Sequence, residues 1–94
     1  MAKTLSLIVP VFNEQEAIDA SFARMYAAMS ALPYAFEIIY VNDGSRDSTM
    51  AHLRAIAGGN GNVRVISFSR NFGHQLAVTA GMDEARGDAL IIID

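Results

Sequence analysis

Several residue types and patterns are missing from this chain. Cysteine is absent from its 94 residues, so neither a disulfide nor a thiolate metal site can form. The formal net charge is −3, which leaves no basic face for nucleic acid and no polybasic membrane anchor. No uninterrupted apolar run, residues 89–93 included, is long enough to cross a bilayer, and the opening MAKTLSLIVPVFNE does not form a signal peptide. We therefore expect a soluble domain.

The common nucleotide-binding and nucleophile motifs are also absent. No G-x-G-x-x-G follows the first apolar run, which counts against a dinucleotide-binding domain, and no G-K-[ST] loop exists, which counts against a nucleoside triphosphatase. No serine lies in a nucleophile elbow. A bound phosphate would therefore have to be held by a metal ion or by Arg46 and Arg70.

The apolar residues that are present predict a layered α/β fold. They make up 52% of the chain, so a buried core is expected. Apolar, β-branched runs predict strands over residues 4–11, 36–42, 63–68 and 89–94. The segments between them predict helices, and the short connections require right-handed crossovers. The expected fold is a Rossmann-like parallel sheet with helices on both faces.

Polar residues that favour helix ends predict where the helices begin. We expect Asn13, Asp47 and Asn71 to be the N-caps of the three helices, and Asn13 stands three residues before a glutamate, as in a capping box. Pro33 stops the first helix, and Gly58-Gly59 ends the second. The third is expected over residues 71–87.

Charged residues gather where the predicted strands end. Ligands of open parallel sheets bind beyond the carboxyl ends of the strands, which here are PVFNE, NDGSRD, SRNFGH and Asp94. Carboxylates placed close together raise one another's pKa and cost stability, a cost that a cation or a hydrogen-bonding ligand relieves. We therefore predict a ligand site at this edge, although Asp43-Gly44-Ser45 is also a common turn sequence.

Three segments resemble a known family. VPVFNE, VNDGSRDST and SRNFGHQLAVTAGMDEARGDALIIID together are similar to the opening of a family 2 glycosyltransferase with the GT-A fold. More narrowly, they resemble the polyprenyl-phosphate glycosyltransferases, which include dolichol-phosphate mannose synthases and bactoprenol glucosyltransferases. The resemblance implies strand order 3-2-1-4. It also implies that residues 1–94 are the N-terminal, nucleotide-sugar-binding part of a catalytic domain, truncated at its D-x-D motif.

The resemblance also implies a site for the sugar nucleotide. Pro10, Phe12 and Glu14 would line the nucleoside pocket, with Phe12 against the base. Asp43 would accept a hydrogen bond from an N–H on the base edge. Uracil offers one such donor and guanine offers two adjacent ones, so a carboxylate suits either base. We expect Arg70 to contact phosphate.

The implied reaction needs more than this chain. Asp94 would be the first D-x-D aspartate, binding Mg²⁺ or Mn²⁺ on the diphosphate of a donor similar to UDP-glucose or GDP-mannose. The acceptor would be a polyprenyl phosphate at the cytoplasmic face of the membrane. The catalytic base, the acceptor site and any membrane attachment are expected beyond Asp94, so none of residues 1–94 is expected to be catalytic.

We expect this chain to bind nucleotide without transferring sugar. We also expect it to self-associate through the open strand edge ALIIID.

A non-enzymatic alternative has the same fold class. A receiver-like signalling module is also a parallel α/β sheet with an acidic, Mg²⁺-binding edge. It would require paired acids after the first strand and a phospho-accepting aspartate after the third. Those places hold Asn13-Glu14 and Ser69-Arg70, which favours the transferase.

Overall fold

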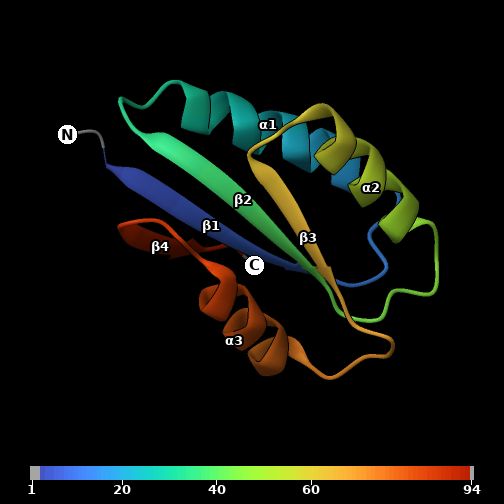
Figure 1. Cartoon of the computed structure of the whole chain (residues 1–94). Helices are drawn as coiled ribbons and strands as arrows, with labels where there is room; N and C mark the ends of the chain where they lie inside the picture. Colours follow the sequence, from blue (N-terminus) through green and yellow to red (C-terminus); the bar gives the residue numbers. More distant parts are fainter. Residues whose placement is uncertain (1–2, 94) are drawn as a thin grey trace.

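Strands and helices alternate along the chain in the computed structural model, which describes residues 3–93 (Figure 1). The strands are β1 (Thr4–Val11), β2 (Ala35–Asn42), β3 (Val63–Ser67) and β4 (Ala89–Ile92). The helices are α1 (Ile18–Ser30), α2 (Thr49–Gly59) and α3 (His74–Glu84). The predicted β-α-β-α-β-α-β order is confirmed.

The four strands form one parallel sheet in the order β3-β2-β1-β4, as the family resemblance implied. β1 pairs with β2 along its whole length, from Thr4 opposite Ala35 to Val11 opposite Asn42. β4 pairs only with the first part of β1, ending with Ile8 opposite Ile92. Because all four strands run the same way, their carboxyl ends share one edge of the sheet.

Helices cover both faces of the sheet. α1 and α2 lie on one face and α3 lies on the other (Figure 1). The larger apolar core is between the sheet and α1 with α2, and a smaller one is between the sheet and α3. α3 approaches closely because Gly81 has no side chain: a Cβ there would collide with Ile8. The Rossmann-like α/β prediction is therefore confirmed.

Two of the three predicted N-caps are wrong, because both asparagines are used in contacts between loops. α1 begins at Ile18, and Asn13 instead adopts φ 50° and accepts a hydrogen bond from the Arg46 N–H on its Oδ1 at 2.8 Å. α3 begins at His74, and the Asn71 amide donates to Asp43. Both loops are therefore tied to residues far away in the sequence.

The prediction for α2 is displaced by one residue. Ser48 is the N-cap position, while the carboxylate of Asp47 accepts the Thr49 N–H at 2.9 Å. Gly58 and Gly59 form the last residues of α2 instead of following it. An aspartate thus satisfies one of the helix's first N–H groups, from a position just outside the helix.

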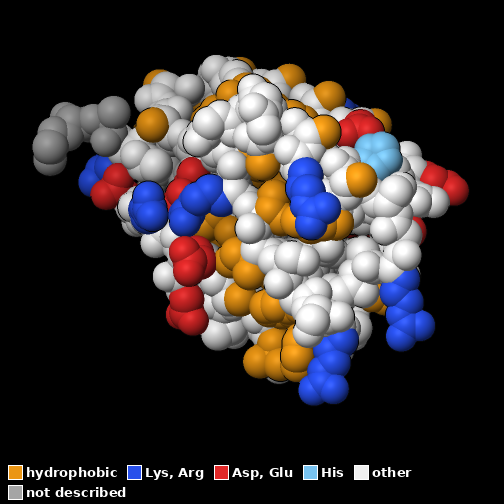
Figure 2. All heavy atoms as spheres, turned by 45° about the vertical axis from the view of Figure 1, so that its right-hand side comes forward, with side chains coloured by type: hydrophobic (Ala, Val, Ile, Leu, Met, Phe, Trp, Pro, Cys, Tyr) orange, Lys and Arg blue, Asp and Glu red, His pale blue; other side chains and the backbone are white. Residues whose placement is uncertain are grey.

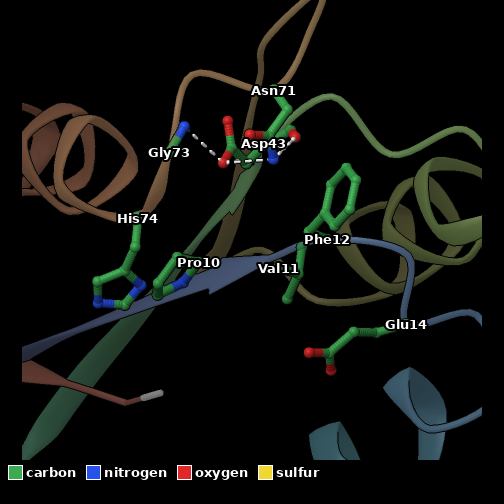
Figure 3. A pocket seen from close by; sticks show the side chains of 8 residues that line it. All are labelled: Pro10, Val11, Phe12, Glu14, Asp43, Asn71, Gly73 and His74. Carbon is green, nitrogen blue, oxygen red and sulfur yellow. Dashed lines mark hydrogen bonds between the residues drawn. The ribbon is translucent and has the colours of Figure 1, made fainter.

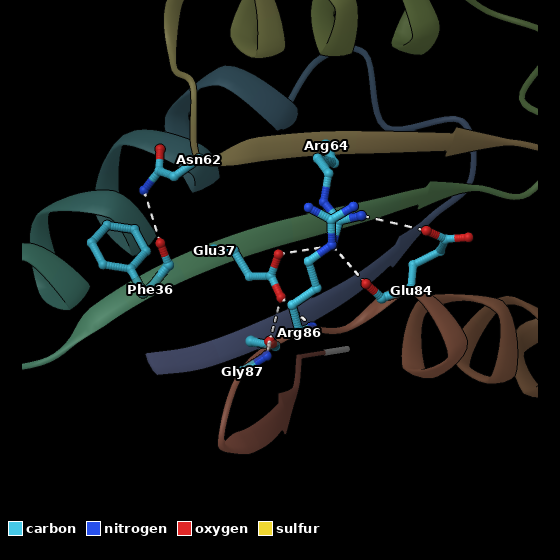
Figure 4. A network of polar contacts seen from close by, with 8 residues as sticks. Phe36, Glu37, Asn62, Arg64, Glu84, Arg86 and Gly87 are labelled. Carbon is cyan, nitrogen blue, oxygen red and sulfur yellow. Dashed lines mark hydrogen bonds and ion pairs between the residues drawn. The ribbon is translucent and has the colours of Figure 1, made fainter. Parts of the chain in front are cut away.

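A polar network ties the α3–β4 connection to the sheet (Figure 4). The Glu37 carboxylate accepts hydrogen bonds from the Ser6 hydroxyl at 2.5 Å, the Arg86 N–H at 2.7 Å and the Arg64 guanidinium at 2.8 Å. The Ser6 hydroxyl in turn accepts the Gly87 N–H at 2.8 Å. Burial raises the pKa of Glu37, but these hydrogen bonds outweigh it and the pKa is lowered overall.

The edge strand β4 leaves apolar side chains exposed. Leu90, Ile91 and Ile92 are 43%, 38% and 47% exposed, so the open edge expected from the strand order is present.

Figure 2 brings the right-hand side of Figure 1 forward and shows hydrophobic side chains exposed among scattered charged ones. None of the helices within residues 3–93 has both the length and the apolar character needed to cross a membrane.

Candidate functional site

A pocket of about 580 Å³ lies at the carboxyl ends of β1 and β2 (Figure 3). Its lining residues are Pro10, Val11, Phe12, Glu14, Asp43, Asn71, Gly73 and His74. The structure therefore brings together four of the residues predicted from the sequence, namely Pro10, Phe12, Glu14 and Asp43. Their roles toward a ligand stay predictions.

Phe12 stands at the rim of this pocket. It directly follows β1, and its side chain is 43% exposed instead of joining the core. Figure 3 shows its ring rising beside the pocket, on the same side as Asp43 and Asn71. An exposed aromatic face beside polar groups provides a surface on which a planar base can stack.

Asp43 is almost completely buried, at 5% exposure, and its carboxylate is held by the loop that precedes α3. Its Oδ1 accepts the Phe72 N–H at 2.7 Å, and its Oδ2 accepts the Gly73 N–H at 3.0 Å and the Asn71 Nδ2 at 3.0 Å. Asn71 Nδ2 also donates to the Asp43 carbonyl at 3.2 Å. We call residues 71–73 the Asp43 loop, because all three donate hydrogen bonds to the Asp43 carboxylate although Asp43 itself lies outside the loop. Asp43 is therefore more than a turn residue.

Gly44 allows the Asp43 loop to lie where it does. Its φ is 71°, in the left-handed region that favours glycine. A Cβ at this position would collide with the backbone of Arg70 and Asn71, which passes directly over it. The glycine of the predicted turn thus permits contact between two loops that come from different strands.

Asp47 organises the neighbouring loop and does not line the pocket. Its carboxylate accepts hydrogen bonds from the Thr49 hydroxyl at 2.5 Å and from the Gln15 N–H at 3.3 Å, while the Thr49 hydroxyl oxygen accepts the Glu14 N–H at 2.8 Å. Desolvation raises the pKa of Asp47, but hydrogen bonds from Thr49 and Gln15 outweigh it and the pKa is lowered. This chain of contacts fixes the backbone of Glu14 at the pocket.

Arg70 lies beside the pocket instead of lining it. Its guanidinium carbon is 4.9 Å from the centre of the Phe72 ring. Arg70 and Arg46 both line an adjoining hollow of about 320 Å³, which shares Phe12 and Asn71 with the pocket. The two arginines that sequence reasoning singled out for phosphate therefore come together next to the predicted nucleoside pocket.

Sequence reasoning did not assign four of the lining residues to the site, namely Val11, Asn71, Gly73 and His74, and of these Asn71 bonds the Asp43 carboxylate through its side chain. Its position before an apolar helical segment predicted a cap, and no local pattern indicated that its amide reaches Asp43. The sequence offered one local sign, the glycines at positions 44 and 73, and the structure shows that both adopt positive φ where the two loops meet.

The predicted metal ligand, Asp94, lies outside the described residues. Within residues 3–93, no three histidine, aspartate or glutamate side chains come close enough to hold a metal ion. The Ile93 N–H donates to the Ile8 carbonyl at 3.0 Å, so β4 stays beside β1 up to the residue before Asp94. The described residues do not form a metal centre by themselves.

Comparison with known proteins gives a consistent picture. The family described as glycosyl transferase family 2 has a model that matches residues 6–94. A bactoprenol glucosyl transferase of Shigella phage SfV is 46% identical over 90 residues, which is 96% of this chain and 29% of that protein. A dodecaprenyl-phosphate galacturonate synthase of Rhizobium johnstonii is 41% identical over 91 residues, again 96% of this chain and 27% of that protein. The chain thus spans less than a third of the length of these relatives.

A solved structure has the same fold. The mannosyltransferase PcManGT from Pyrobaculum calidifontis, in complex with GDP-Man and Mn²⁺, superposes with a TM-score of 0.81 at 20% sequence identity. The match covers 96% of this chain and 26% of that protein. At this identity the likeness concerns the arrangement of strands and helices alone.

Proposed function

This chain belongs to glycosyl transferase family 2, and we propose that its pocket binds the nucleoside diphosphate part of a sugar donor. The single observation that carries the proposal is the placement of an exposed aromatic ring, Phe12, beside a buried carboxylate, Asp43, in one pocket. The ring offers a stacking surface for a base, and the carboxylate offers an acceptor for a base N–H.

The residues around Phe12 and Asp43 support binding of the rest of the nucleoside diphosphate. Pro10 and Glu14 supply further walls of the pocket. Arg46 and Arg70, in the adjoining hollow, supply positive charge for phosphate oxygens. A receiver-like module would need an acid after β3, where Ser69 and Arg70 stand, so the sequence favours the transferase.

For the whole enzyme, we propose sugar transfer to a polyprenyl phosphate at the cytoplasmic face of the membrane. The support is the family and the names of the two relatives, which refer to bactoprenol and to dodecaprenyl phosphate. Asp94 and a second D-x-D aspartate would hold Mg²⁺ or Mn²⁺, which would stabilise charge on the leaving diphosphate. The base that activates the acceptor is assigned to neither Asp43 nor Glu14, and we place it beyond Asp94.

Calorimetric titration of the chain with UDP and GDP, each with Mn²⁺, tests the binding proposal. Phe12→Ala should weaken nucleotide binding by about 1–3 kcal/mol, because a base loses its stacking partner. Tyr34→Ala is the matched control: Tyr34 is also aromatic and 44% exposed, but it precedes β2 at the opposite end of the sheet. Equal binding by wild type and Phe12→Ala would contradict the proposed pocket.

We also propose that the chain self-associates through β4. Within residues 3–93, no strand pairs with its outer edge, and its exposed isoleucines are an apolar surface that a second copy would cover. Light scattering at rising concentration should show association in the wild type and its loss in Ile92→Lys. Leu76→Lys is the control, since Leu76 is 53% exposed but lies on α3. A wild type that stays monomeric at high concentration would refute this proposal.

A further inference from the structure

The acceptor sites on the Asp43 carboxylate are unequally occupied. An ionised carboxylate has about four acceptor sites, roughly two on each oxygen. The Asp43 loop already fills two on Oδ2, with the Gly73 N–H and the Asn71 amide, and one on Oδ1, with the Phe72 N–H. Counted over residues 3–93, these donors leave acceptor capacity for one further hydrogen bond, and it is on Oδ1.

This occupancy distinguishes two kinds of nucleobase. Uracil presents one imide N–H between two carbonyl groups, so a single acceptor site satisfies it. Guanine presents two adjacent N–H donors, and a carboxylate satisfies both only when each oxygen has a site to offer. With Oδ2 filled, one guanine donor would be left without its acceptor, and unpaired polar groups in a complex reduce affinity.

The loop is held in place by features beyond the carboxylate. The backbone of Arg70 and Asn71 lies against Gly44, and the amide of Asn71 also donates to the Asp43 carbonyl at 3.2 Å. Phe72 packs edge-on against Phe68, with ring centres 5.4 Å apart. These contacts mean that the loop cannot move away from Oδ2 without leaving both the glycine and the aromatic pair.

We propose that the Asp43 loop makes the pocket selective for uracil over guanine nucleotides, with Asn71 as the positioning residue that fills Oδ2. The inference rests on the proposed binding of a nucleoside diphosphate at this pocket. Asn71 acts through Asp43 and is not assigned a contact with the ligand. The donor of the sugar would accordingly be a uridine diphosphate sugar.

The test is a comparison of UDP and GDP affinity, each with Mn²⁺, for wild type and Asn71→Ala. The wild type should bind UDP roughly tenfold or more tightly than GDP, because one unpaired donor costs about that factor. Asn71→Ala frees one site on Oδ2, so the UDP-to-GDP affinity ratio should fall several-fold, mainly because GDP binds more tightly. Asn60→Ala is the matched control: it also removes an amide that bonds a backbone carbonyl, but at the end of α2, and it should keep the wild-type ratio.

The outcomes separate this inference from the function on which it rests. GDP binding as tight as UDP binding would overturn the selectivity while leaving nucleotide binding intact. An unchanged ratio in Asn71→Ala, or weaker GDP binding there, would overturn the role of Asn71, since its amide would then be either irrelevant or a direct partner of guanine. Failure of both nucleotides to bind would overturn the proposed function and the inference with it. Thermal unfolding of each variant shows whether a change in ratio is separate from a change in stability.

Discussion

Replacing Gly44 with alanine tests how the two loops at the pocket are held together. At φ 71° a residue with a Cβ costs about 1–2 kcal/mol relative to glycine. The added methyl group would also collide with the backbone of Arg70 and Asn71, and overpacking of this kind costs about 1–3 kcal/mol. The two effects together predict a loss of roughly 2–5 kcal/mol in the free energy of unfolding. A domain of this size has about 5–15 kcal/mol in total, so Gly44→Ala should fold but be clearly weakened.

Urea unfolding of wild type, Gly44→Ala and Gly58→Ala measures this effect with an internal control. Gly58 lies within α2, and a Cβ added there meets nothing within 4 Å. Alanine is the better helix former, so Gly58→Ala should raise the free energy of unfolding by about 0.5–1 kcal/mol. The same chemical change is thus expected to have opposite signs at the two glycines. A Gly44→Ala protein within about 0.5 kcal/mol of wild type would refute the close approach of the loops.

Three further predictions concern the core, the polar network and activity. The pKa of Glu37 is lowered in the folded state from its usual 4.5. The Glu37 carboxylate therefore stabilises the fold above pH 4.5, and this stabilisation is lost as the pH falls through the folded pKa. The free energy of unfolding should fall less steeply with decreasing pH in Glu37→Gln than in wild type, and equal steepness would contradict the network. Burial, with Asp19 and Glu14 nearby, raises the pKa of Tyr40 to about 12, and its buried hydroxyl has no hydrogen-bond partner among residues 3–93. Tyr40→Phe should therefore stabilise the chain by about 1 kcal/mol in urea unfolding, whereas a loss of that size would reveal a partner for the hydroxyl. Purified chain should show no transfer of radiolabelled sugar to a polyprenyl phosphate, and detectable product would refute our placement of the base and acceptor site beyond Asp94.

The strands were predictable because their signal is local and repeated. Residues 4–11 and 36–42 are nearly continuous apolar runs, and the structure buries Leu7, Ile8 and Ile39 completely. A run of this kind has few alternatives to a strand covered on both faces. The strand order came from the family resemblance, since the periodicity of a single chain does not say which strands are neighbours.

The helix starts and the loop contacts were less predictable, for a physical reason. Asparagine side chains satisfy backbone groups either in their own turn or in a loop that folding brings close, and the residue type is the same in both cases. Asn13 and Asn71 bond partners 33 and 28 residues away, so a local rule misplaced them as caps. Asp43 lines the pocket, as expected for a residue at the end of a strand, while its role toward a ligand stays a prediction. Its three partners in the Asp43 loop became visible only in the fold.

We propose a nucleoside diphosphate as the ligand of the pocket at the ends of β1 and β2. The most direct test of this proposal is a titration of ¹⁵N-labelled chain with UDP, with and without Mg²⁺, followed by amide chemical shifts. We predict that the shifted amides cluster at residues 11–14, 43–46 and 70–74, with the largest changes at Phe12 and in the Asp43 loop. Shifts confined to other surfaces, or none at saturating UDP, would show that this pocket does not bind the nucleotide.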